Sequence, residues 1–336
     1  MDIQIILQQM LMLFAMMVTG YFIWKKEWFD ENAYLKLSKV VVNILNPLLV
    51  VNGVLGKDSG GDLSLLLQNL GFVVFFYLLL AIASFALAGA LRPPKAQRRL
   101  YRLMAIFPNV GFMGIPVITS IYGAECMIYI VFYMLGYNLL LYTYGLSLAK
   151  KAAEDAVHAE GTGPGSKRDA GAGDFGAGTS PGAGEAPGKQ WLRMVNPGVV
   201  FSLIAVAVFL FRLQAPAPIV SFCDYMGNAT IPLSMLLIGM SIAKSDLKSI
   251  FTDARIYGFT AIKMVALPIA AVLLLKPFGA DPVILGVFAL QLSMPVGNIV
   301  TLIAKEYGAD ETTCTNGIVL STLASILTIP LVCMFL

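Results

Sequence analysis

The sequence predicts an all-α membrane protein with ten transmembrane helices, arranged as two inverted five-helix repeats. Three observations lead to this fold class. The chain of 336 residues is 58% hydrophobic and 13% charged, whereas about 25% of the residues in an ordinary soluble domain are charged. It divides into ten apolar segments, each near the roughly 20 residues that cross a bilayer. Two landmarks also recur in both halves of the chain at one constant offset.

Short polar connections separate the apolar segments, and one connection near the middle is much longer than the others. The first segment is expected to remain attached, because Lys25 and Lys26 follow its apolar stretch, whereas a cleaved secretory signal carries its positive charge in front. The predicted spans cover residues 3–24, 34–55, 64–91, 99–121, 125–149, 192–213, 219–242, 255–276, 282–304 and 311–336.

The two landmarks recur at an offset of 185 residues. Pro47 and Pro232 lie in similar apolar settings, each four residues after an asparagine and directly before a leucine. Tyr122-Gly-Ala-Glu likewise has its counterpart in Tyr307-Gly-Ala-Asp. Because five spans per half is an odd number, the second half must enter the membrane in the opposite orientation. Such an inverted repeat is typical of secondary transporters.

The predicted domains are a first five-helix repeat over residues 1–150, a linker over 151–190 and a second, inverted repeat over 191–336. The linker is rich in Gly, Ala, Ser and Pro, a composition that favours a flexible connection over a packed core. Its Gly188-Lys189 pair lacks the remaining residues of a phosphate-binding loop, and no strand precedes it. The single histidine, His158, lies in this segment and is expected to be a solvated loop residue.

Lysine and arginine predict the orientation. Of these 23 residues, 19 fall in the first, third, fifth, seventh and ninth connections, and loops rich in them stay cytoplasmic. We therefore expect a multi-pass protein of the cell membrane with both termini outside and the linker in the cytoplasm. The net charge of +3 follows from this topology, so the lipid bilayer is an expected partner and nucleic acid is not.

Residues that several enzyme classes need are missing from the apolar spans. The four cysteines are scattered, which indicates neither a zinc site nor a redox pair. A serine hydrolase would lack a histidine base inside the membrane. Every Asp and Glu lies in a connection or at a span end, which excludes a pair of catalytic aspartates and a buried carboxylate that could hold sodium or a proton. No enzyme activity, cofactor or metal is expected.

The fourth and ninth spans, which are equivalent in the two halves, hold most of the polar and helix-breaking residues of the membrane interior. Proline removes a backbone donor and glycine loosens the backbone, so both helices are expected to break partway across. Backbone groups freed in lipid survive only beside protein or a water-filled cavity. The predicted site residues are Pro108, Asn109, Gly111, Gly114 and Pro116 in the fourth span, and Pro295, Gly297 and Asn298 in the ninth.

Two broken helices that meet near the midplane would line a cavity. The N-termini of their half-helices carry partial positive charge and unpaired N–H groups, which suit a carboxylate. A less specific alternative is that the prolines only kink the helices, and that Asn109 and Asn298 make interhelical hydrogen bonds worth about 0.6 kcal/mol. Interruption of both equivalent spans favours the binding site, because it is the best sequence indication of where a transporter holds its substrate.

Lys263 is the one basic residue inside a predicted span. It lies ten residues after Asp253, which is about 15 Å of helix rise and half the hydrocarbon thickness. A charge at this depth costs about 2.5 to 3.5 kcal/mol, so Lys263 either reaches out to the interface or has a function. In the second case its charge would be offset by carbonyls at a helix C-terminus at the crossing, or by an anionic substrate.

Four segments resemble the auxin efflux carrier family, whose bacterial members include malonate and malate carriers. They are PNVGFMGIPV in the fourth span, NPLLV in the second, IKMVALPIAA in the eighth and QLSMPVGNIVTLIAKEYG in the ninth. The resemblance covers nearly the whole chain. The central linker is far shorter than the loop of many plant members, so the regulation that plant carriers exert through that loop is not expected.

The resemblance implies a fold similar to that of sodium-bile acid symporters and sodium-proton antiporters. Spans one, two, six and seven would form a scaffold, kinked at Pro47 and Pro232, and the other spans a moving transport domain with crossed broken helices. Asn109 and Asn298 would donate hydrogen bonds to a substrate carboxylate, with Asn46 on the scaffold side of the pocket. Family members typically pair as homodimers through their scaffolds.

The expected function is secondary transport of a small organic anion, such as a mono- or dicarboxylate, by an elevator-like movement of one domain against the other. The lack of buried carboxylates further predicts that no sodium gradient is needed. One alternative is a sodium-coupled symporter of the related fold, which can hold sodium with backbone carbonyls and amides. Another is a membrane receptor that binds the same ligands without moving them.

Overall fold

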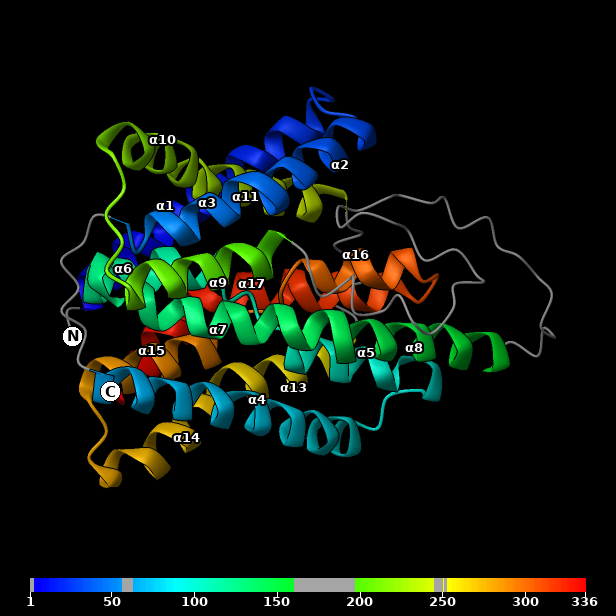
Figure 1. The fold of residues 1–336 in the computed structure, drawn as a ribbon. Coiled ribbons are helices and arrows are strands. Elements are labelled where there is room, and N and C mark those ends of the chain that lie inside the picture. The colour runs from blue at the N-terminus through cyan, green and yellow to red at the C-terminus, as the bar shows by residue number, and fades with distance from the viewer. Residues whose placement is uncertain (1–2, 56–62, 160–196, 245–249, 251–252) are drawn as a thin grey trace, which may run out of the picture.

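The structure is a computed structural model that describes residues 3–55, 63–159, 197–244, 250 and 253–336, and every element within these ranges is a helix. Figure 1 shows the helices packed alongside one another, with the two chain ends at one end of the molecule and the end of α8 (Leu146–Ala159) at the other. The predicted all-α class is confirmed.

The helices follow the predicted spans closely. In the first half they are α1 (Ile3–Lys25), α2 (Glu31–Val40), η1 (Val41–Leu45), α3 (Asn46–Asn52), α4 (Leu63–Leu91), α5 (Lys95–Ile106), α6 (Gly114–Tyr122), η2 (Ala124–Cys126), α7 (Met127–Leu140), η3 (Leu141–Gly145) and α8. In the second half they are α9 (Pro197–Leu210), α10 (Ala217–Asn228), α11 (Thr230–Lys244), α13 (Ala254–Ala261), η5 (Ile262–Ala266), α14 (Leu267–Leu275), η6 (Lys276–Phe278), α15 (Pro282–Ser293), α16 (Ile299–Glu306) and α17 (Glu311–Cys333). The elements η1, η3 and η5 are single π-helical turns inside longer helices.

Within the described residues, seven helices are long and apolar enough to cross a membrane. They correspond to the predicted spans one, two, three, five, seven, eight and ten. The fourth and ninth spans are each divided into two shorter helices, α5 with α6 and α15 with α16. The sixth is represented by the 14 residues of α9, and its first predicted residues, 192–196, lie outside the described ranges. The arrangement of ten spans as an inverted repeat stays a prediction.

The predicted linker starts too early. Helix α8 continues to Ala159, past the predicted start at residue 151, because Lys, Ala and Glu, all good helix formers, dominate these positions. Ala149 and Ala152 are buried where α8 packs against α5. His158 therefore lies in a helix, and its expected loop setting was wrong. Residues 160–190 of the predicted linker lie outside the described ranges.

One of the two sequence landmarks has a clear conformational role. Helix α6 begins at Gly114 and α16 begins at Ile299, which keeps the offset of 185 residues. Gly123 and Gly308 follow these helices with φ values of 82° and 73°. Only glycine adopts this left-handed conformation without strain, and it commonly ends helices. The repeated Tyr-Gly-Ala motif thus ends corresponding helices in both halves.

Helices α1 and α11 pack so closely that their backbones touch. A Cβ atom on Gly239 would lie 1.9 Å from the carbonyl oxygen of Met17, and one on Gly20 would lie 2.2 Å from that of Leu236. Small residues permit such close approach between membrane helices. Since α1 comes from the first half of the chain and α11 from the second, this contact joins the two halves.

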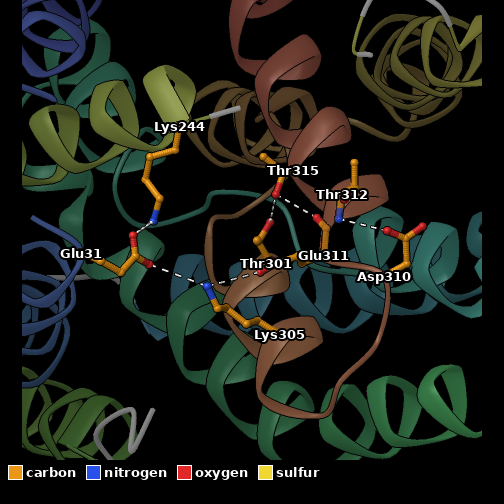
Figure 2. A network of polar contacts seen from close by, with 8 residues as sticks. All are labelled: Glu31, Lys244, Thr301, Lys305, Asp310, Glu311, Thr312 and Thr315. Atoms are coloured by element: carbon orange, nitrogen blue, oxygen red, sulfur yellow. Dashed lines mark hydrogen bonds and ion pairs between the residues drawn. The ribbon is translucent and has the colours of Figure 1, made fainter. Parts of the chain in front are cut away.

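A network of ion pairs lies at one end of the helices (Figure 2). Glu31, in the first turn of α2, is 2.5 Å from Lys244 at the end of α11 and 3.7 Å from Lys305 in the last turn of α16. Lys305 is also 3.6 Å from Glu311, at the start of α17. Glu31 therefore connects α16 to both α2 and α11.

Candidate functional site

Both predicted helix breaks are present. Helix α5 ends at Ile106 and α6 begins at Gly114, while α15 ends at Ser293 and α16 begins at Ile299. The proline in each gap, Pro108 or Pro295, has no N–H for a helical hydrogen bond, which is one reason why neither helix continues. Two stretches of non-helical backbone therefore lie within the predicted fourth and ninth spans.

The two breaks satisfy each other's backbone groups. Pro108 and Val296 form an antiparallel bridge. On either side of it, the Asn109 N–H donates to the Pro295 carbonyl at 2.7 Å, and the Gly297 N–H donates to the Phe107 carbonyl at 2.9 Å. Because unpaired backbone groups are costly in hydrocarbon, each broken helix stabilises the other at the point where they meet.

Gly297 has a steric role at this meeting point. A Cβ atom there would lie 2.9 Å from the Tyr137 hydroxyl, 3.1 Å from the Phe107 carbonyl oxygen and 3.2 Å from the Pro108 carbonyl oxygen. Any larger residue would press against the Tyr137 side chain and the backbone of the fourth-span break. The Tyr137 ring also packs edge-on against Phe107, with ring centroids 5.5 Å apart.

A cavity of about 100 Å³ lies beside the bridged segments. By this measure a single water needs about 10 to 15 Å³, so the cavity has room for several waters or a small organic molecule. Its lining comes from α2, η1, α3, α7, η3, α11, α16 and both breaks. It includes six of the ten predicted site residues, namely Asn46, Pro108, Asn109, Gly111, Gly297 and Asn298.

Asn109 lines the cavity and keeps one hydrogen-bond donor unpaired. Its Oδ1 accepts a hydrogen bond from the Phe112 N–H at 3.2 Å. Since a backbone N–H can only donate, this contact assigns the oxygen and leaves the Nδ2 group at the other position. That Nδ2 is buried and has no protein partner. A buried donor without a partner is costly, and an acceptor bound in the cavity would remove this cost.

Three further side chains of the cavity lining carry buried polar atoms that lack a partner. They are Oδ1 of Asn46, Oδ1 of Asn298 and Oγ of Ser234. Asn46 faces the fourth-span break, since a Cβ atom on Gly111 would lie 3.9 Å from its Oδ1. Asn46 on α3 and Ser234 on α11 come from predicted scaffold spans, whereas Asn109 and Asn298 come from the breaks. Residues with unsatisfied polar groups thus line the cavity from both the predicted scaffold and the breaks.

The half-helices that follow the breaks add positive potential. Helix α6 starts after Met113 and α16 starts after Asn298, and neither N-terminus has a side-chain cap. The first N–H groups of a helix lack intrahelical partners and carry a partial positive charge. Among the residues that line the cavity, none carries a formal charge. The positive potential within the lining therefore comes from dipoles.

Four predicted site residues lie outside the cavity lining. Pro295 contributes its carbonyl to the bridge, and Pro116 is buried within α6. Gly114 faces α15, because a Cβ atom there would lie 2.8 Å from Oε1 of Gln291. Lys263 is fully buried in η5 and donates a hydrogen bond to the carbonyl oxygen of Met294, directly after α15. This is the carbonyl partner at the crossing that was one of the two predicted alternatives.

Several polar residues of the cavity were not predicted from the sequence. They are Tyr34, Ser38, Tyr137, Asn138, Tyr142 and Ser234. Gln291 was also missed, although it is fully buried and donates to the Val110 carbonyl at 3.3 Å beside the fourth-span break. Tyrosine and serine are ordinary residues of membrane helices. The only signal that could have identified them is their position on helices that flank the predicted breaks.

Two relatives are similar to this chain. A protein of Rhizobium meliloti (strain 1021) named "Putative malonate transporter" is 27% identical over 135 residues, which is 40% of this chain and 42% of that protein. A protein of Methanothermobacter thermautotrophicus named "Uncharacterized transporter" is 22% identical over 333 residues, or 96% of each chain. The chain thus matches less than half of the first relative and nearly all of the second.

The family comparison covers almost the entire chain. Residues 5–333 match a family described as membrane transport protein. This range contains both breaks, the cavity and all ten predicted site residues. The chain therefore belongs to the membrane transport protein family, which is the auxin efflux carrier family that its sequence resembles.

Proposed function

We propose that this transporter carries a small organic anion with at least one carboxylate group, and that the anion binds where the two broken helices meet. The observation that carries the proposal is the buried Nδ2 group of Asn109, which has no partner while the Oδ1 of this cavity-lining residue is held by Phe112. The family and both relatives are transporters and not enzymes.

The chemistry of the cavity favours an anion over a cation. Asn109 offers a donor, and the N-termini of α6 and α16, which have no side-chain cap, offer partial positive charge. Among the described residues, no carboxylate lines the cavity. Asn298 would supply a second donor, because an asparagine carries donor and acceptor on one group that rotation exchanges. A cation would find acceptors in Asn46 and Asn298 but no compensating negative charge.

The shape of the cavity supports alternating access. Its lining extends from Asn46 to Tyr34, twelve positions earlier on the same continuous helix, which is about 18 Å at 1.5 Å per residue. Tyr34 lies near the end where Glu31 pairs with Lys244 and Lys305. By the predicted orientation this is the cytoplasmic end, so the structure would represent an inward-facing conformation.

We propose that the transport movement is elevator-like. One wall of the cavity, with Asn46 and Ser234, comes from the predicted scaffold, and the wall with the broken helices comes from the predicted transport domain. A rigid-body slide of the second wall along the first would carry a bound anion across the membrane. We further propose that two copies pair through their scaffolds, as the family resemblance implies.

Flux measurements with purified protein in proteoliposomes test the substrate site. Counterflow of labelled malonate, malate and acetate is measured for the wild type and for Asn109→Ala and Asn298→Ala. Each substitution removes a hydrogen bond to a charged group, worth about 1.5 to 3 kcal/mol, so binding should weaken about 10- to 150-fold. Asn43→Ala is the matched control, because Asn43 binds the Lys39 carbonyl within its own helix and does not line the cavity.

The same assay separates the alternatives. A receptor would bind the anion but show no counterflow of labelled substrate. A sodium-coupled symporter would require sodium at a fixed membrane potential, whereas our proposal expects equal flux with and without it. Unchanged flux in both cavity variants, with correctly folded protein, would contradict the assigned site.

A further inference from the structure

The described part of the chain contains one charged side chain that is buried, and it is Lys263. It lies in η5, in the predicted eighth span, with 0% of its surface exposed. Full burial excludes the alternative in which the ammonium group reaches the membrane interface. Within the described residues Lys263 makes no ion pair with a carboxylate, and its Nζ donates a hydrogen bond to the Met294 carbonyl oxygen.

The Met294 carbonyl lies at the C-terminus of α15, next to the proposed anion site. Met294 is the residue directly after α15, at the end where a helix carries partial negative charge. The next carbonyl along the chain, that of Pro295, accepts the hydrogen bond of Asn109 that holds the two breaks together. The ammonium group and the proposed anion site are therefore joined through two consecutive peptide groups.

A buried charge of this kind is not explained by packing alone. Even a buried ion pair can often be replaced by apolar residues of similar volume without loss of stability. A methionine in place of the unpaired Lys263 would therefore fill the same space at lower cost. Unlike methionine, the lysine places a positively charged ammonium group against the carbonyl that follows α15. Backbone carbonyls at such a broken helix end are also the groups with which carriers hold a coupling cation.

We infer that Lys263 is a tethered cation, whose ammonium group occupies at the end of α15 the place that a dissolved coupling cation would otherwise take. The inference rests on the proposed anion transport and concerns its coupling. The ammonium group of Lys263 offsets the partial negative charge at the C-terminus of α15, and it favours binding of an anion at the neighbouring breaks. Anion binding then requires no sodium, since the Lys263 ammonium group fills the cation position.

The expected effect on affinity follows from the distance. The chain geometry places the ammonium group within about 10 Å of Asn109, because the Met294 and Pro295 carbonyls belong to adjacent peptides. At that separation, and at an effective dielectric constant of about 20, loss of a unit charge weakens anion binding roughly tenfold. Lys263 is thus a positioning residue that acts on the anion without touching it.

The test measures binding of malonate, malate and acetate, as N-methylglucamine salts, to purified full-length protein by calorimetry, with and without 100 mM sodium chloride. The wild type is expected to bind with the same affinity in both conditions. Lys263→Met should remain folded and bind roughly tenfold more weakly. Lys263→Ala should bind as weakly, and added sodium or ethylammonium should restore part of its affinity by entering the vacated space.

Lys276 provides a matched control. It also donates to backbone carbonyls, those of Phe335 and Leu336 at 3.3 Å, but it is exposed. Lys276→Met and Lys276→Ala should bind like the wild type and gain nothing from sodium or ethylammonium. Equal affinity of the wild type and Lys263→Met without sodium would overturn the inference and leave the proposed function intact.

Two further outcomes are decisive without any variant. If the wild type requires sodium for anion binding, a dissolved cation has a site of its own and the tethered-cation inference is wrong, even where Lys263 variants fail to fold. If the wild type binds none of the three anions under either condition, the proposed function fails and the inference fails with it.

Discussion

The ion pair between Glu31 and Lys305 is predicted to stabilise the conformation described here over the other conformation of the transport cycle. Glu31 begins α2, in the predicted scaffold, and Lys305 ends α16, in the predicted transport domain (Figure 2). An elevator-like slide would separate these two residues. Glu31→Gln removes the charge, keeps nearly the same shape and therefore shifts the equilibrium between the two conformations.

The size of the shift follows from distance and exposure. The pair is 3.7 Å apart, and the two side chains are 52% and 45% exposed. Exposed pairs of this kind contribute about 0.2 to 1 kcal/mol, which corresponds to a change in the ratio of conformations of roughly 1.4- to 5-fold. The contact between Glu31 and Lys244 adds nothing to this shift, because both residues lie in the predicted scaffold.

Pulsed electron paramagnetic resonance, with one spin label on α2 and one on α16, would measure the fraction of protein in each of the two conformations. The wild type, Glu31→Gln and Glu311→Gln are compared at low ionic strength and again in 1 M salt, where the Debye length is about 3 Å. Glu311→Gln is the control, because its pair with Lys305 at 3.6 Å lies within the predicted transport domain. Equal populations in the wild type and Glu31→Gln at low salt, or an equal shift in Glu311→Gln, would refute the reasoning.

Three other substitutions give separate predictions. Gly239→Val should abolish or strongly reduce the yield of folded protein in detergent, since even a Cβ atom would lie 1.9 Å from the Met17 carbonyl oxygen. Tyr77→Phe should destabilise the protein by about 1 kcal/mol in thermal unfolding, because its hydroxyl donates to the buried Tyr133 carbonyl at 2.6 Å. Gly297→Ala should lower substrate flux while leaving the unfolding temperature nearly unchanged, since its Cβ would press on the Tyr137 hydroxyl at 2.9 Å. Unchanged flux would contradict the proposed role of the crossing.

The breaks in the fourth and ninth spans could be predicted because they depend on local chemistry. Pro108 and Pro295 cannot donate a helical hydrogen bond wherever they lie, so the sequence alone indicates where α5 and α15 must end. A general constraint also predicts that the backbone groups of each break are satisfied, since backbone groups freed inside a membrane must find partners. The sequence did not indicate that the partner of each break would be the other break.

The other polar residues of the cavity lining could not be predicted in the same way. Ser234 and Tyr137 lie outside the two predicted breaks, and they became candidates only when tertiary packing placed them in the cavity lining. The partner of Lys263 was left open between a helix-end carbonyl and a substrate, because span assignment gives its depth but not its direction. The extent of α8 was also missed, since its alanines read equally well as a linker until α5 is present to bury them.

The bridge between the breaks explains how the crossing can be stable without a ligand and still have a hydrogen-bond donor available to bind one. The backbone N–H groups of Asn109 and Gly297 donate hydrogen bonds to the partner segment. The two broken helices therefore need no substrate to stay together. The Asn109 side chain takes no part in this pairing, and its Nδ2 group has no hydrogen-bond partner. In the proposed function, a carboxylate that binds this group would need no rearrangement of the crossing, and the occupied site would move as one rigid body. Any variant that breaks the bridge should therefore lose rigidity and affinity together, whereas Asn109→Ala should lose affinity alone.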